Sequence, residues 1–439
     1  MSAVGAATGG ALTYRRVLAI ALPIVLSNAT VPLLGAVDTG VIGRLGEAAP
    51  IGAVGLGAVI LTSVYWVFGF LRMGTSGLVA QAHGAGDRAE VAAHLIRALV
   101  IAAAAGFGLI LMQGVLVAGA LRLAPASAEV EEMARTYLSI RIWGAPATIG
   151  LYALTGWLIA LERTRLVFVL QLVMNGLNVV LDLWFVLGLG WGVGGVATAT
   201  LIAEWSGLAL ALWFAREAIR PGLRAGLFAA EPLRRLWRVN GDILIRSVLL
   251  QGSFTSFMFL AAGQGDTTLA ANQVLLQFLS FVAYLLDGFA FAAESLVGQA
   301  VGARRPDRLR EAALKSSQLG GIGALLLALV FALFGPAIID LLTTAPDVRA
   351  EARHYLPWLV AAPLIGVASW MLDGIFIGAT RTREMRNAMI VAVGIYAVLV
   401  LVLPRFMGNH GLWAALMALN ALRGVTMWRL YPQVARAGA

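Results

Sequence analysis

The stretch VLAIALPIVLSNATVPLLGAVDTGVI, residues 17–42, indicates the fold class of this chain. It is long enough to cross a lipid bilayer with some tilt, because roughly 20 apolar residues suffice for a transmembrane helix. Pro23 and Pro32 lie inside it, and each removes a backbone donor and can bend the helix. The run also contains one carboxylate, Asp38, which is either a functional acid inside a span or part of a wetted helix end at the headgroups. We favour the first reading, a bendable helix that senses a proton or a cation.

The composition predicts that the whole chain is a polytopic membrane protein. Of its 439 residues 60% are hydrophobic and 13% charged, with a mean hydropathy of +0.85, which leaves too little polar surface for a soluble globule. The chain contains no cysteine, so disulfides and thiolate metal sites are excluded. Arg15 and Arg16 precede a first run that is too long for the apolar core of a signal peptide, which predicts an uncleaved first span.

Twelve apolar runs are long enough to span a membrane, and together they predict an all-α fold with twelve transmembrane helices: residues 17–42, 51–80, 95–121, 137–161, 166–189, 192–215, 240–262, 269–301, 314–342, 355–379, 387–407 and 411–430. The net charge of +9 comes from arginines in the short connectors, so it reflects membrane topology and not nucleic-acid binding. With the N-terminus inside, one side receives 21 Arg and Lys residues and the other six. This imbalance predicts a multi-pass protein of the cell inner membrane with both termini cytoplasmic.

An internal repeat organises the chain into two halves. A shift of about 218 residues places LVAQAHGA at residues 78–85 on LVGQAVGA at residues 296–303, and RTR at residues 163–165 on RTR at residues 381–383. The polar segment between the halves predicts three parts: an N-lobe of spans 1–6 at residues 1–215, a cytoplasmic linker at 216–238, and a C-lobe of spans 7–12 at 239–439. An even number of spans per half gives both halves the same orientation, and a cleft between them is the expected substrate path.

Acidic and amide side chains gather in the first half. Asn175, Asn178 and Asp182 are three and four residues apart and share one helix face, and Thr200 and Glu204 form a second polar stripe. The positions that correspond to Asp38 and Asp182 in the second half carry no acid. Converging oxygens in a dry site can hold a proton or a sodium ion, and burial disfavours the ionised carboxylate. Alternatively, the two asparagines only join helices by hydrogen bonds.

Other charged residues inside spans have two interpretations. Arg72 in the second span and Asp287 and Glu294 in the eighth are expected to face the cleft, where Arg72 either neutralises an acid or contacts substrate. A further set is interpreted as interfacial or structural: Arg141, Arg246, Asp373 and Arg423. The four histidines lack metal-ligand spacing, and no nucleophile lies beside a base, so neither a metal site, a cofactor nor an enzyme is predicted.

Several segments together resemble the multidrug and toxic compound extrusion (MATE) family, and specifically its DinF branch: PLLGAVDTGVIG, GFLRMGTSGLVAQAHGA, IRIWGAPA, MNGLNVVLDLWF, LLDGFAFAAESLVGQAVGA and LDGIFIGATRTREMRNAM. The resemblance covers nearly all of both halves. It implies a two-lobe antiporter that exports organic, often cationic or amphipathic, compounds against inward proton or sodium flow. By the same resemblance Asp38 matches the family's first-helix acid and Pro23 its helix-bending proline, while Asn178, Asp182 and Thr200 match its N-lobe ion cluster.

These observations predict a secondary active antiporter that works by alternating access, with H⁺ as the coupling ion and Na⁺ as the alternative. A sodium ion would be held by Asp38, Asn178, Asp182 and Thr200, and Glu204 joins Arg72, Asp287 and Glu294 as a cleft residue. The predicted partners are small organic substrates and the bilayer, with no nucleic acid, and the predicted state is a monomer. The rival hypotheses are a flippase for a lipid or lipid-linked precursor and a membrane scaffold or sensor.

Overall fold

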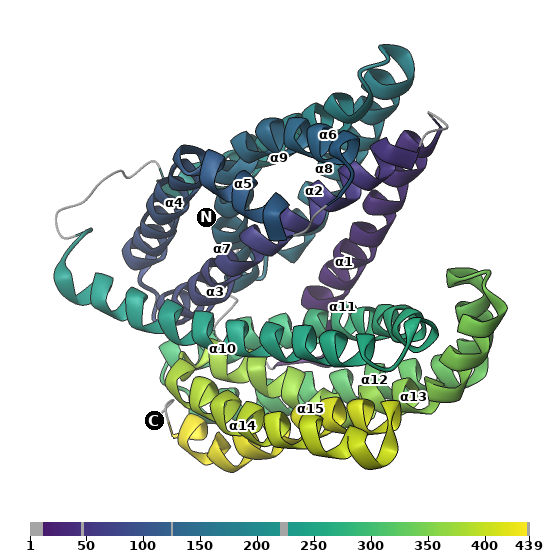
Figure 1. Cartoon of the computed structure of the whole chain (residues 1–439). Coiled ribbons are helices and arrows are strands. Elements are labelled where there is room, and N and C mark those ends of the chain that lie inside the picture. Colours follow the sequence, from purple (N-terminus) through teal and green to yellow (C-terminus); the bar gives the residue numbers. More distant parts are fainter. Residues whose placement is uncertain (1–11, 45–47, 124–125, 220–226, 437–439) are drawn as a thin grey trace. The chain divides into compact units, whose positions relative to one another are not determined.

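The computed structural model describes residues 12–44, 48–123, 126–219 and 227–436, and all regular structure in these ranges is helical (Figure 1). The helices of the first half are α1 (Tyr14–Gly43), α2 (Ala48–Trp66), α3 (Phe70–Gly84), α4 (Arg88–Leu111), α5 (Gln113–Leu123), α6 (Ala128–Arg141), α7 (Ala145–Ala160), α8 (Thr164–Asp182) and α9 (Gly192–Ile219). Those of the second half are α10 (Ala230–Ala262), α11 (Asp266–Gly302), α12 (Pro306–Leu342), α13 (Pro346–Gly378), α14 (Thr382–Met407) and α15 (Asn409–Ala435).

The predicted all-α polytopic membrane fold is confirmed, and each of the twelve predicted spans falls on one helix or on consecutive helices. Ten helical stretches in the described ranges are long and apolar enough to cross a membrane. The first and twelfth predicted spans correspond to α1 and α15. Short 3₁₀ helices join α2 to α3 (η1, Val67–Gly69) and α6 to α7 (η2, Ile142–Gly144). A π-helical segment (η3, Leu183–Gly188) extends α8.

The internal repeat is visible in the backbone. Left-handed residues recur at the predicted shift of 218, at Gly86 and Arg304 and again at Glu162 and Thr380. Glu162 and Thr380 end their helices in the same way. The residue after each donates its backbone N–H to a carbonyl five positions earlier: Arg163 N to Leu158 O at 2.8 Å, and Arg381 N to Phe376 O at 2.9 Å. A positive φ is uncommon for residues other than glycine. Its recurrence in register therefore supports a duplicated helical plan.

The described residues form two compact units. One unit contains residues up to Val25, residues 80–86 and the chain from Trp237 onward, and the other contains residues 26–79 and 87–236. The helix α1 therefore contributes to both units, with the division two residues after Pro23. The boundaries predicted at residues 215 and 239 stay a prediction, and residues 220–226 of the linker lie outside the described part.

Each unit has its own apolar core. In the unit that holds α10–α15, Phe257 packs edge-on against Trp413 at a centroid distance of 4.9 Å, and Phe278 packs likewise against Phe331. The other unit is built from pairs such as α4 with α7 and α8 with α9, around a core that includes Tyr137. Many large apolar side chains stay on the outside of the helices, Phe406 among them, as expected where lipid replaces water.

Candidate functional site

Two carboxyl groups from different helices meet inside the unit of residues 26–79 and 87–236. Asp38 lies near the end of α1 and is half-buried, while Asp182 is the last residue of α8 and is 0% exposed. The two carboxyl groups lie within hydrogen-bonding range of each other. Within the described part of the chain, neither oxygen of Asp182 accepts a hydrogen bond from a protein donor, and neither does Oδ1 of Asp38.

This arrangement requires a proton or a cation. Two ionised carboxylates at such close range repel each other, and burial adds a desolvation cost to each charge. A hydrogen bond between two carboxyl groups can form only when one of them is protonated, so the pair is expected to share a proton. The pair is therefore a chemical device that binds and releases one positive charge.

Asn178 and Thr200 extend this cluster. Asn178 Nδ2 donates to Thr200 Oγ1 at 3.3 Å, and the same hydroxyl donates to Val196 O one turn earlier on α9 at 3.0 Å. Asn178 is buried, and its Oδ1 accepts no hydrogen bond from the described residues. The predicted spacing on α8 thus places an amide oxygen one turn before the Asp182 carboxyl, so three acceptor-bearing side chains share this region.

The backbone beside Asp182 is irregular. The π-helical segment η3 starts at the following residue, Leu183, and Leu189 N and Trp191 N close its end by donating to Trp184 O and Phe185 O, both at 2.9 Å. Phe185 and Trp191 stack at a centroid distance of 4.8 Å. Single turns of π-helix occur often at functional sites. Here the segment ends the regular helix at the buried acid.

Asn175 makes two side-chain hydrogen bonds in the structure. Its Nδ2 donates to Thr30 Oγ1 at 2.8 Å, and its Oδ1 accepts from Gln171 Nε2 at 3.0 Å. Both polar ends of the amide are satisfied, and the bond to Thr30 joins α8 to α1. These bonds agree with the alternative of a helix-joining asparagine, and a role of Asn175 in ion coupling stays a prediction. Asn178 differs, because its Oδ1 has no partner among the described residues.

A buried ion pair stands beside the acids, and it engages the predicted cleft residue Glu204. Arg141 at the end of α6 donates twice to this carboxylate on α9, with Nη1 to Oε2 at 2.6 Å and Nη2 to Oε1 at 2.9 Å. Arg141 also acts electrostatically on Asp38, and its backbone carbonyl accepts from Tyr65 Oη at 3.3 Å. Opposite charges in two apolar spans are a signal of such pairing. Arg141 was predicted to be interfacial or structural, and Glu204 is the partner that its sequence position alone does not identify.

The repeat-related position in the other unit is neutral and hydrogen-bonded. At the shift of 218, Asp38 corresponds to Ser256 and Asn178 to Tyr396. Tyr396 Oη donates to Ser253 O at 2.8 Å and lies 3.1 Å from Ser256 Oγ. The same place in the duplicated fold thus carries hydrogen-bonded hydroxyls in one unit. In the other unit it carries a carboxyl pair with three oxygens that have no donor among the described residues. This contrast singles out the Asp38 and Asp182 pair as a specialised feature.

The unit that contains α10–α15 has a buried cluster of one acid and two arginines. Asp373 on α13 accepts from Arg246 on α10 and from Arg423 on α15, the latter at 2.6 Å, and Arg423 Nη1 donates to Asn420 Oδ1 at 3.0 Å. One carboxylate between two guanidinium groups leaves a net positive charge. These residues were predicted to be structural, and their mutual pairing agrees with that reading.

The remaining predicted residues are divided between the two units. Arg72 lies on α3 in the same unit as the carboxyl pair, whereas Asp287 and the fully buried Glu294 lie on α11 in the other. Their pairing across the predicted cleft stays a prediction. Pro23 and Pro32 both fall within α1, but the side chain of Pro32 lies outside the described part. The described residues contain no group of three or more His, Asp or Glu side chains arranged to hold a metal ion.

Fold and site together define a polytopic helical membrane protein that is built from a repeat and carries a buried carboxyl pair in one unit. The MatE family model matches residues 23–184 and 243–403, and the chain belongs to this family of MATE transporters. It is similar to DNA damage-inducible protein F of Escherichia coli (strain K12), with 42% identity over 421 residues that cover 93% of this chain and 91% of that protein.

More distant relatives agree with this assignment. A probable multidrug resistance protein NorM of Synechococcus is 29% identical, over 82% of this chain and 78% of that protein. The solved bent form of the Vibrio cholerae MATE transporter VcmN has the same fold, with a TM-score of 0.85, 20% identity and coverage of 97% of both chains. The chain is therefore a multi-pass membrane transporter of a family whose members move small molecules.

Proposed function

We propose that this chain is a secondary active antiporter that exports organic cationic or amphipathic compounds by alternating access, driven by inward proton flow. The observation that carries the proposal is the Asp38 and Asp182 pair, in which three of the four oxygens have no donor among the described residues. An antiporter needs a group that is loaded on one side of the membrane and unloaded on the other. A buried carboxyl pair that gains or loses one proton meets this need.

The chemistry of the pair favours a proton over sodium as the coupling ion. One shared proton satisfies both carboxyl groups through a single hydrogen bond, and it needs no further ligand. Sodium would need several oxygen ligands, yet Thr200 Oγ1 already accepts from Asn178 and donates to Val196. The hydroxyl therefore has one acceptor lone pair left, and the other ligands of a sodium ion would have to come mainly from the carboxyl pair.

Helix α1 is the element that we expect to move. Protonation of Asp38 and Asp182 from outside removes charge repulsion, α1 bends near Pro23, and the bound compound is released outward. Deprotonation toward the inside resets the carrier. Two features support a hinge: Pro23 cannot donate a backbone hydrogen bond, and α1 contributes to both compact units, which divide after Val25. One solved structure of the Vibrio cholerae MATE transporter VcmN is described as a bent form.

Cationic cargo is inferred from the acids of α11. Asp287 is half-buried and Glu294 is fully buried, and both belong to an apolar helix. Glu204 is a weaker candidate for substrate contact because a cationic compound would have to displace Arg141 from it. The proposal also includes location in the inner membrane with cytoplasmic termini, which the arginine distribution supports. It includes a monomeric state because one chain carries both repeats.

The experiment is efflux of a fluorescent cationic dye from proteoliposomes, with an imposed pH gradient and no sodium compared against a sodium gradient at equal pH. We expect transport under the pH gradient, reduced to the level of empty liposomes in Asp38→Asn. The matched control is Glu217→Gln, which neutralises an exposed acid on the helix that holds Thr200. Export at the wild-type level by Asp38→Asn would refute the mechanism. Transport under the sodium gradient alone would reassign the pair as a sodium site, and transport with neither would favour a lipid flippase.

A further inference from the structure

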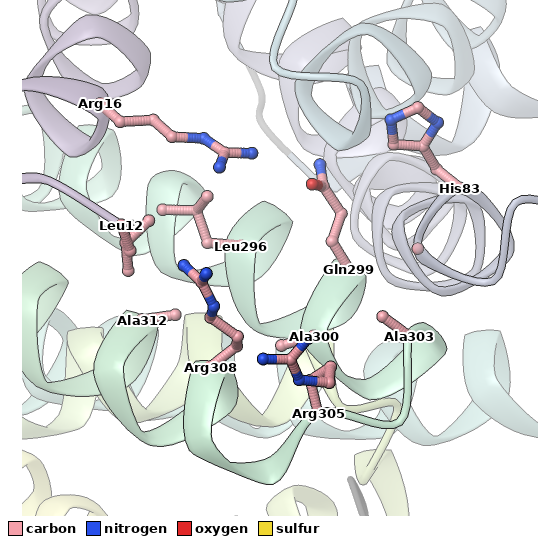
Figure 2. A pocket seen from close by; sticks show the side chains of 11 residues that line it. Leu12, Arg16, His83, Leu296, Gln299, Ala300, Ala303, Arg305, Arg308 and Ala312 are labelled. Atoms are coloured by element: carbon pink, nitrogen blue, oxygen red, sulfur yellow. The ribbon is translucent and has the colours of Figure 1, made fainter. Parts of the chain in front are cut away.

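Two pockets lie beside α12 in the unit that contains α10–α15, and they differ in size and chemistry. One has a volume of about 80 Å³ and is lined in part by Gln299 and Arg308 (Figure 2). The other, the apolar pocket, has a volume of about 340 Å³ and lies between α12, α13 and α15. Pockets that hold small molecules usually measure about 300–1,000 Å³. The apolar pocket therefore has the size of a ligand site.

Helix packing explains why the apolar pocket exists. Helix α13 packs on both α12 and α15, whereas α12 and α15 hardly touch each other, so a gap remains between them over the surface of α13. Further from the helix ends, Gly320 of α12 lies against the Met371 side chain, and Gly424 of α15 lies against Ala368. These glycines bring both helices close to α13. The pocket thus lies toward the start of α12 and the end of α15.

The apolar pocket has a buried floor and an exposed rim. Met371 and Ile375 line it from α13, and each is 2% exposed. Leu314 on α12 and Trp428 on α15 also line it, and they are 59% and 69% exposed. A pocket with such a rim opens to the surroundings of the helices. In a membrane protein these surroundings are lipid, so we expect an apolar occupant.

An arginine stands beside this pocket. Arg310 is exposed in the second turn of α12, four residues before Leu314, so the two side chains share one face of the helix. Arg310 also acts electrostatically on Tyr431, which lines the pocket from α15. Both walls of the apolar pocket therefore approach the same guanidinium group.

Nearby acids are engaged by other cations. Asp307 pairs with Arg305 at 3.1 Å, and Glu311 pairs with Lys315 at 2.8 Å. Among the described residues, no acid forms an ion pair with Arg310. An apolar pocket with one uncompensated cation at its edge fits a ligand that has an apolar chain and an anionic head.

We propose that the apolar pocket binds a phospholipid with an anionic headgroup, with one acyl chain in the pocket and the phosphate group at Arg310. Acyl chains are the apolar ligand that a bilayer offers, and guanidinium groups bind phosphate oxygens through charge-assisted hydrogen bonds. Trp428 and Tyr431 fit this arrangement, because tryptophan and tyrosine concentrate where a span leaves the bilayer. The site is separate from the carboxyl pair and does not depend on the coupling ion.

Native mass spectrometry of the full-length protein in an uncharged detergent tests the site, because it counts the lipids that each molecule retains. The protein is titrated in turn with phosphatidylglycerol, phosphatidylcholine and glycerol 3-phosphate, which lacks acyl chains. We expect phosphatidylglycerol to be retained at the lowest concentration, phosphatidylcholine at a higher one, and glycerol 3-phosphate not at all. Arg310→Gln should need about fivefold more phosphatidylglycerol for half-occupancy, because it removes one basic residue near the membrane surface.

Filling the pocket should abolish retention. Ala368→Phe does so from an exposed position on α13, and Ser317→Phe does so from α12 if the first variant does not fold. The matched controls are Ala332→Phe, at an exposed position of α12 outside the pocket, and Arg383→Gln, at an exposed position of α14. Both controls should retain phosphatidylglycerol as the wild type does.

Several outcomes would overturn the proposal. The first is wild-type retention by Arg310→Gln or by a folded variant with a filled pocket. Equal losses in the two controls would show that lipid binds without a defined site. Glycerol 3-phosphate retained as tightly as phosphatidylglycerol would reveal a site for soluble anions instead. A wild-type dimer that Ala368→Phe separates would assign the pocket to a second copy of the chain.

Discussion

At the scale of single residues, two acids on neighbouring helices show how surroundings set the role of a carboxyl group. Glu204 receives two hydrogen bonds from Arg141, so the guanidinium compensates its charge. Asp182, at the end of α8, is more deeply buried, and among the described residues its carboxyl group interacts with that of Asp38. The first acid is fixed by a guanidinium, and the second must bind a proton or a cation. Only the second can change state during a transport cycle.

Replacement of the titrating acid by its neutral isostere separates folding from coupling. In Asp182→Asn, the amide can donate to Asp38 permanently and so imitates the protonated pair. We expect stability to be unchanged or higher by about 1 kcal/mol, as for one net hydrogen bond, while dye efflux is lost. Melting temperature and proteoliposome efflux measured on the same preparation give both values. A variant that melts much earlier, or that exports dye normally, would contradict the shared-proton arrangement.

Removal of one partner from the Arg141 and Glu204 pair should instead lower the stability of the protein. Glu204→Ala leaves a guanidinium buried without its partner, and the expected loss of stability is about 3 kcal/mol. The double variant Arg141→Leu/Glu204→Leu removes both charges and should recover most of that loss. Thermal unfolding of the three proteins in detergent is the measurement. If the double variant were as unstable as the single one, packing and not charge would explain the effect.

At the scale of elements, the repeat motifs themselves form a helix crossing. Gly84 on α3 packs against the Gln299 carbonyl on α11, and reciprocally Gly302 packs against the Gln81 carbonyl, so each motif supplies the glycine that the other requires. Gln81 Nε2 then donates to Gly378 O at 3.0 Å, which attaches α13 to the same crossing. Equivalent positions of the repeat thus meet each other inside one unit.

This crossing should tolerate no side chain. A Cβ at Gly302 would lie 2.7 Å from the carbonyl carbon of Gln81, and because the obstacle is backbone, no rotamer change relieves it. We expect Gly302→Ala to cost about 3 kcal/mol or to prevent accumulation of folded protein. The control is Gly321→Ala on α12, where a Cβ meets nothing within 4 Å and a helical alanine is favoured. Size-exclusion profiles and melting temperatures compare the two, and equal behaviour would argue against a close crossing.

Hydropathy predicted the helices well but not their ends or their neighbours. The run 137–161 is part of a helical stretch that already begins at Ala128, because Glu129 and its acidic neighbours extend α6 beyond the apolar segment that hydropathy detects. Helical spacing placed Asn178 and Asp182 on one face. It could not distinguish Asn175, which bonds to Thr30, since spacing within one helix does not say which helix lies opposite. The pairing of Arg141 with Glu204 could not be predicted for the same reason, because it depends on which helices are neighbours.

At the scale of the whole molecule, a duplicated backbone carries different charges in its two halves. The first half places a carboxyl pair and the Arg141 and Glu204 ion pair inside its unit, while the second places Asp373 between two arginines. A repeat that only packed helices would keep equivalent positions similar. The differences therefore support the proposal that ion coupling belongs to the first half.

The proposed orientation in the membrane can be tested because the chain has no cysteine, so a single introduced thiol is the only one to react. Glu129 is exposed in the connector between the third and fourth spans, on the side that receives few arginines, and Arg310 is exposed among the arginines of the connector between the eighth and ninth. The charge asymmetry places the first outside and the second in the cytoplasm. A membrane-impermeant maleimide should therefore label Glu129→Cys on intact cells, and Arg310→Cys only after the cells are opened. The reverse pattern would invert the topology.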